Sequence, residues 1–143
     1  MQGRREARER ALELLYEAEA KRTTCAAIVD DLPAAPDPYA TTLANGVDGD
    51  RDTIDGLLRA NSKGWTLERM PAVDRALLRL ATFELLHQPD VPVAVAISEA
   101  VELAQQFSTD ESGRFVNGVL SAVAKQTRPA AAPEAAPDDA SDD

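Results

Sequence analysis

Apolar side chains recur at helical spacing along most of this chain, and that pattern restricts it to an all-helical fold. In the first segment Ala7, Ala11, Leu14, Leu15 and Ala18 follow the spacing i, i+4, i+7, i+8 and i+11, which places them on one face of a helix. Strand signals are scarce, because aromatic residues make up only 4% of the chain and apolar and polar residues do not alternate between turn signals. We therefore predict an all-α protein.

Prolines and glycines divide the chain into segments, and each apolar segment between them predicts one helix. Pro71 and Pro92 each stand where a helix can begin, because the first helical position needs no N–H donor. The predicted helices cover residues 4–21, 24–32, 39–61, 71–87 and 92–107 and a last segment with Phe115, Val116, Val119, Leu120 and Val123, with one short turn at residues 65–70.

Two local patterns bear on these boundaries. Ser108 and Glu111 have the S-x-x-E spacing of a capping box, which predicts that the last helix begins at Ser108. Three glycines lie inside the segment 39–61, where each costs a helix about 1 kcal/mol relative to alanine. We nevertheless predict one continuous helix over that segment.

The chain is acidic, and its charge is unevenly distributed. Its net charge is −10 over 143 residues, and five acidic residues but no lysine or arginine follow Arg128. Residues 1–127 have the length of one ordinary domain. Residues 128–143 consist mainly of alanine, proline and acidic residues, which bury too little apolar surface to fold, so they predict a disordered tail.

The sequence predicts a soluble, cytoplasmic protein. Its N-terminus is rich in arginine and has no apolar signal core, and no apolar run is long enough to span a membrane. Cys25 is the only cysteine, so no internal disulfide can form, which fits a reducing compartment.

Catalytic motifs are missing from the sequence. His87 is the only histidine; it could pair with Cys25, but a favourable position at a helix C-terminus is the simpler interpretation. No histidine or cysteine cluster has zinc-site spacing, and no glycine-rich phosphate loop or G-x-S-x-G motif occurs. We predict a protein that is not an enzyme and needs no metal or cofactor.

The first ten residues carry a cluster of four arginines, Arg4, Arg5, Arg8 and Arg10. Guanidinium groups are forked donors that suit phosphate, and Tyr16 lies about three helical turns beyond Arg5, where its ring could stack on an unpaired RNA base. The alternative is a solvated helix crossed by Arg5–Glu9 and Glu6–Arg10 ion pairs, and composition alone favours that alternative.

A second candidate lies in the last predicted helix. Arg114 and Asn117 are three residues apart and could present donors together, whereas Phe115 has core character. Asn117 and Gly118 both disfavour a helix interior. A close approach between helices would explain Gly118 without any function, and the sequence alone favours that explanation over a ligand contact.

Several blocks of the sequence resemble the NusB family of transcription antitermination factors. The blocks are RR at residues 4–5 with AR at 7–8 and ALELLY at 11–16, DRALLRLA at 74–81, EL at 84–85, DVP at 90–92, ISEAVELA at 97–104 and FVNGVL at 115–120. The resemblance spans residues 4–125 and is weak over residues 21–63. Glu6 departs from it, because family members often continue the arginine run there, and Ser98 stands where the family often has asparagine.

The resemblance implies an all-helical fold of two small bundles with about seven helices. It implies that the chain binds the boxA element of ribosomal-operon leader RNA together with the ribosomal protein NusE, so that RNA polymerase reads through terminators. The family's RNA-binding residues correspond to Arg4, Arg5, Arg8, Arg10, Tyr16, Arg114 and Phe115. The implied NusE surface includes Asp74, Arg75 and Glu84.

Two other functions fit parts of this pattern. A NusB-like module precedes the catalytic domain of some ribosomal RNA cytosine methyltransferases, but this sequence ends at Asp143 without a cofactor-binding domain. The chain could instead be a protein-interaction module without direct RNA binding, such as a homodimer that hides the arginine helix.

Overall fold

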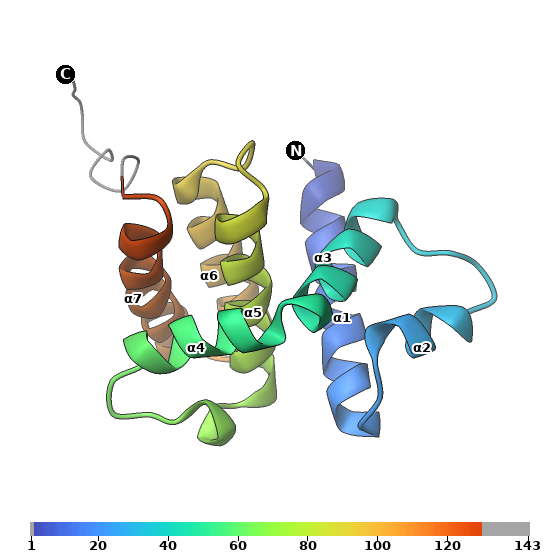
Figure 1. Ribbon diagram of the computed structural model, residues 1–143, viewed down its shortest axis with the longest axis horizontal. Coiled ribbons are helices and arrows are strands. Elements are labelled where there is room, and N and C mark those ends of the chain that lie inside the picture. Colours follow the sequence, from blue (N-terminus) through green and yellow to red (C-terminus); the bar gives the residue numbers. More distant parts are fainter. Residues whose placement is uncertain (1, 130–143) are drawn as a thin grey trace.

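The computed structural model describes residues 2–129, and this part of the chain contains helices and no strand (Figure 1), which confirms the predicted all-α class. Most of the predicted tail, residues 130–143, lies outside the described residues. The described elements are α1 (Gln2–Lys21), α2 (Cys25–Asp30), α3 (Pro38–Gly49), α4 (Arg51–Asn61), the 3-10 helix η1 (Leu67–Arg69), α5 (Ala72–His87), α6 (Val93–Phe107) and α7 (Asp110–Thr127).

Helix α5 lies at the centre of the molecule and joins two groups of helices. It contacts α1 and α3 on one side and α4, α6 and α7 on the other (Figure 1). Ten of its 16 residues are buried. Because both groups pack on this one helix, the two small bundles share a continuous core, to which six helices each contribute a fully buried leucine: Leu14, Leu43, Leu58, Leu77, Leu103 and Leu120.

The predicted apolar face of the first helix is buried. Ala7, Ala11, Leu14, Leu15 and Ala18 are each 5% exposed or less, and the face packs against α3 and α5. Helix α1 ends at Lys21, because Arg22 adopts the left-handed conformation with φ of 55°. Glycine is the residue that usually fills this position after a helix.

The prediction of one helix over residues 39–61 is wrong, because the chain leaves the helical conformation at Asp50. The φ and ψ angles there are −126° and 31°, and the Asp50 N–H bonds to the carbonyl oxygens of Gly46 and Val47. The Asp50 carboxylate lies 2.7 Å from His87 Nε2 at the end of α5. The break lets α3 pack on α1 while α4 packs on α7 (Figure 1).

The predicted capping box at Ser108 is also wrong. Thr109 is the N-cap of α7, because its hydroxyl accepts a hydrogen bond from the Ser112 N–H at 2.9 Å. Ser108 instead follows the last turn of α6, and its N–H bonds to the Ala104 carbonyl. Both serine and threonine are good N-cap residues, so the sequence did not decide between adjacent candidates.

Close helix packing occurs at Gly46 and not at Gly118. A Cβ atom at Gly46 would lie 2.3 Å from the Phe83 ring, so α3 approaches α5 closely at this glycine. A Cβ atom at Gly118 would meet nothing within 4 Å. Close packing therefore does not explain Gly118, contrary to the interpretation that the sequence favoured.

Arg128 belongs to the folded body and not to the predicted tail. Its guanidinium donates to the carbonyl oxygens of Leu85, Val91, Glu84 and Gln88, at 2.5–3.0 Å. These carbonyls lie at the end of α5 and in the turn before α6, so Arg128 fastens the end of α7 to that turn. The ordered body thus extends past the predicted boundary at residue 127.

Candidate nucleic-acid interface

The four N-terminal arginines lie on α1, but they differ in how free their side chains are. Arg4 and Arg10 are partly exposed. The Arg4 guanidinium lies 4.1 Å from the centre of the Tyr39 ring and 3.3 Å from the Asp90 carboxylate. Arg10 pairs with Glu13 at 2.8 Å, one turn along α1, and not with Glu6 as the sequence suggested.

Arg5 is held by two carboxylates of α6. It donates from Nε and from one terminal nitrogen to Glu99, and from the same terminal nitrogen to Glu102. The hydrogen bonds that Arg5 donates to Glu99 are the main reason that the Arg5 pKa is raised and the Glu99 pKa is lowered. Arg5 therefore pairs across the α1–α6 contact and not with Glu9, but about a third of its side chain remains exposed.

Arg8 lies inside the protein, which corrects the prediction that its guanidinium is presented to RNA. It is 3% exposed, and its Nε lies 3.0 Å and 3.1 Å from the two carboxylate oxygens of Glu84 on α5. Tyr39 donates its hydroxyl to the same carboxylate at 2.6 Å, and burial is the first cause of its raised pKa. Arg8 thus neutralises a buried carboxylate.

Tyr16, predicted to stack on an unpaired base, is exposed. Its exposed fraction is 49%, and its ring is one of four large apolar or aromatic side chains that the described residues leave open to solvent. It lies on α1 eleven residues beyond Arg5, about 16 Å along the axis at 1.5 Å per residue.

Arg114 and Phe115 stand in the first turns of α7 beside a third residue, Trp65. Arg114 is exposed, and Phe115 is partly buried. The Trp65 and Phe115 rings meet edge to face with their centres 5.0 Å apart, and Trp65 keeps 38% of its surface exposed. Trp65 was predicted only as part of a short turn and not as a candidate site residue. A lone tryptophan after Lys63 and Gly64 in a polar loop was the available signal.

Two of the three residues predicted to contact a protein partner are buried, which corrects that part of the prediction. Asp74 and Glu84 are 0% exposed. Asp74 accepts a hydrogen bond from the Ser112 hydroxyl at 2.8 Å and so holds the first turn of α7 against α5. Arg75 is partly exposed and pairs with Glu19 at 2.8 Å.

His87 and Cys25 do not form a pair. His87 lies at the end of α5 against Asp50. Cys25 is fully buried, and burial is the main cause that raises the pKa of its thiol to about 12. Among the described residues no group of three histidine, cysteine or acidic side chains has the geometry of a metal site.

Charged residues interrupt the two longest helices within residues 2–129, α1 and α7. Helix α7 has 18 residues, but it carries Asp110, Glu111, Arg114 and Lys125. The longer α1 is also rich in charged residues. No described helix is both long enough and apolar enough to span a bilayer.

A small helical protein with an arginine cluster at the start of its first helix and with exposed aromatic side chains belongs to a class that many sequences share. Comparison with known proteins narrows that class. Residues 5–125 match the NusB family. That match covers most of the chain, so the protein belongs to the NusB family, which confirms the resemblance seen in the sequence.

Solved structures agree with this assignment. NusB from T. maritima is 34% identical, with a TM-score of 0.82 over 92% of this chain and 96% of the T. maritima chain. A chain from a crystal structure of the antitermination factors NusB and NusE in complex with dsRNA is 25% identical, with a TM-score of 0.76 over 88% of this chain and 98% of the other. NusB from Aquifex aeolicus is also 25% identical, with a TM-score of 0.71 over 96% and 97%.

Proposed function

We propose that this protein is a transcription antitermination factor that binds boxA leader RNA together with NusE. In this role it acts in the cytoplasm within an RNA polymerase complex and promotes read-through of ribosomal RNA operons. The observation that carries the proposal is the family match over residues 5–125, together with the similarity to a NusB chain solved with NusE and RNA. The protein takes part in this process by binding and not by catalysis.

The proposed RNA surface follows the exposed members of the predicted set. Arg4, Arg5 and Arg10 supply guanidinium groups for phosphate, and Tyr16 supplies a ring for an unpaired base. Arg114 and Phe115 on α7 form a second contact, to which we add Trp65, because its ring is exposed and packs on Phe115. Arg8 makes no RNA contact in this proposal. Its buried ion pair with Glu84 holds the N-terminal part of α1 against α5.

The proposed NusE surface lies near α6 and α7. Asp74 is buried and does not contact the partner directly. It supports this surface by accepting a hydrogen bond from Ser112, which holds the first turn of α7 in place. Phe107 is 46% exposed at the end of α6, just before that contact, and offers an apolar side chain to a partner. Arg75 is the one member of the predicted set with surface available for contact.

A salt-dependent RNA titration tests the proposed RNA surface. The affinity for single-stranded boxA RNA is measured with and without NusE at several salt concentrations, and log K is expected to fall by about 0.7 per decade of salt for each neutralised phosphate. Arg5→Ala combined with Tyr16→Ala is expected to weaken binding at least tenfold, because a phosphate contact and a stacked base are both lost. Arg69→Ala is the control, because Arg69 is an exposed cation in η1 and lies on neither helix of the proposed RNA surface.

A charge-removing variant tests the contact from the other direction. Glu102 is exposed and holds Arg5, so Glu102→Gln is expected to strengthen RNA binding about two- to fivefold by freeing a guanidinium donor and removing a like charge near phosphate. Unchanged affinity in both this variant and the Arg5–Tyr16 variant would contradict the role of α1.

A protein-interaction module without RNA binding is the alternative, and the family match does not favour it. Light scattering measures the mass of the protein alone, with NusE and with RNA. A complex that contains one copy of this chain, NusE and RNA supports the proposal. A stable homodimer that excludes RNA would support the alternative.

A further inference from the structure

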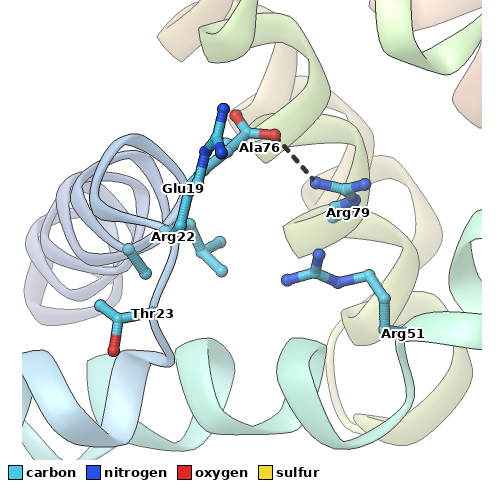
Figure 2. Close-up of a pocket in the computed structure, with 8 residues that line it drawn as sticks. Glu19, Arg22, Thr23, Arg51, Ala76 and Arg79 are labelled. Atoms are coloured by element: carbon cyan, nitrogen blue, oxygen red, sulfur yellow. Dashed lines mark ion pairs between the residues drawn. The ribbon is translucent and has the colours of Figure 1, made fainter.

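A pocket of about 220 Å³ lies where the end of α1 meets α4 and α5 (Figure 2). It is at the opposite end of α1 from the arginines proposed to bind RNA. Its volume is below the range of about 300–1,000 Å³ that suits drug-sized ligands, so it fits a small ion or group. The residues that line it are Leu15, Ala18, Glu19, Arg22, Thr23, Arg51, Ala76 and Arg79.

The charge at this pocket is positive, although the whole chain is strongly acidic. Three arginines and one carboxylate, that of Glu19, line the pocket. The lining arginines and Glu19 pair in turn with Asp48, Asp55 and Arg75. Even with these partners included, four guanidinium groups face three carboxylates, so the site carries an excess positive charge.

The guanidinium groups at the pocket have donors that no neighbour uses. Arg75, just outside it, makes four hydrogen bonds, to Glu19 and to two backbone carbonyls. Arg51 makes one, to Asp48 at 2.8 Å, and its buried Nε has no partner. Among the described residues Arg22 has no ion pair. Arg79 donates two hydrogen bonds to Asp55, and its other terminal nitrogen lies 3.7 Å from Glu19. Arg22 and Arg51 therefore hold most of the unused donors at this site.

The backbone also places these cations at the pocket. Arg22 adopts the left-handed conformation with φ of 55°, which costs a residue with a side chain about 1 kcal/mol or more. Arg51 is the first residue of α4, so the positive end of that helix dipole lies at the same edge. Figure 2 shows the Arg51 and Arg79 side chains extending from α4 and α5 toward α1.

We propose that this pocket binds a small tetrahedral oxyanion, with Arg22, Arg51 and Arg79 as its ligands. Forked guanidinium donors match the geometry of phosphate oxygens. Three arginines line this one small pocket: Arg22 directly after α1, Arg51 in α4 and Arg79 in α5. The anion is either free phosphate or one phosphate of an RNA backbone. Binding would connect the end of α1 to α4 and α5 and so link the two groups of helices.

Nitrogen-detected NMR of the full chain tests this site. Inorganic phosphate is titrated at constant ionic strength against chloride, and the arginine Nε–H signals are followed. Saturable shifts of the Arg22, Arg51 and Arg79 signals are expected. Arg22→Gln and Arg51→Gln are each expected to weaken binding about tenfold, because each removes a charged hydrogen bond. Arg59→Gln is the control, because Arg59 is an exposed arginine on the same helix as Arg51 but outside the pocket.

A second titration with dimethyl phosphate distinguishes the two sources of the anion, because this diester imitates an RNA backbone phosphate. Tighter binding of inorganic phosphate assigns the pocket to a free dianion, and tighter binding of the diester assigns it to RNA. Absence of saturable shifts with either probe would overturn the proposal, as would equal binding by the wild type and a folded Arg22→Gln variant. Arg22 makes no ion pair with the described residues, so this variant keeps the fold.

Discussion

Arg8 lies in the interior, although arginine is among the residue types that are rarely buried. Its role follows from Glu84, which is 0% exposed and would be an uncompensated buried charge without a partner. The two residues are 76 positions apart in the sequence, and no local pattern links them. The arginine cluster was therefore visible in the sequence, but the one arginine that faces inward could not be identified from spacing.

Replacing Arg8 tests this structural role. Arg8→Ala is expected to lower the free energy of unfolding by about 3–5 kcal/mol, because Glu84 would remain buried without its ion pair. Urea denaturation followed by circular dichroism measures the change. The control is Arg59→Ala, which removes an exposed pair and is expected to leave stability nearly unchanged. A loss below about 1 kcal/mol for Arg8→Ala would show that the pair is not needed.

A glycine substitution tests the close approach of α3 and α5. Gly46→Ala would place a Cβ atom 2.3 Å from the Phe83 ring, and the displaced ring is expected to cost about 1–3 kcal/mol of stability. Gly56→Ala is the matched control in α4, where the new methyl group meets nothing within 4 Å and helix propensity predicts a gain of about 0.5–1 kcal/mol. Thermal unfolding compares the two variants, and equal melting temperatures would contradict the packing argument.

Helix positions were largely predictable because burial repeats with the helical period, whereas breaks and caps depend on distant contacts. The residues on the apolar face of α1 are buried as their spacing indicated. The break at Asp50 was missed, since it is fixed by His87 on another helix. The N-cap of α7 was misplaced by one residue, because both Ser108 and Thr109 suit that position.

The contact between α1 and α6 is expected to weaken in acid. The hydrogen bonds from Arg5 are the first cause that holds the Glu99 pKa below its usual value of 4.5. Because the folded protein has the lower pKa, this pair stabilises the fold fully above the usual value, and its contribution is lost as the pH falls through the lowered value. Urea unfolding at a series of pH values below 6 measures the loss. In Glu99→Gln that acid dependence is expected to decrease, and an identical pH profile would refute the assignment.

At the scale of the whole molecule, one helix joins the two groups, and ion pairs connect them at both ends of α1. Near its start Arg5 and Arg8 reach α6 and α5, and near its end Glu19 meets Arg75 and Arg79. These pairs join residues separated by 56 to 94 positions, so the sequence could indicate the charges but not their partners. The surface left for RNA is therefore smaller than the arginine count suggested.

The end of the folded body depends on Arg128. Its guanidinium bonds to four carbonyls. The Glu84 and Gln88 carbonyls also accept backbone N–H groups, whereas the Leu85 carbonyl lies in the last turn of α5, where helix carbonyls lack an intrahelical partner. The Arg128 side chain therefore completes the end of α5 and fixes α7 beside it. Arg128→Ala is expected to lower the free energy of unfolding by about 2 kcal/mol, the scale of a charged hydrogen bond to buried acceptors. Lys125→Ala, an exposed cation one turn earlier, is expected to have no such effect. Chemical denaturation measures both, and hydrogen exchange would show faster opening at the α5–α6 turn in Arg128→Ala. If that turn exchanged at the wild-type rate, the body would end at residue 127, as the sequence alone suggested.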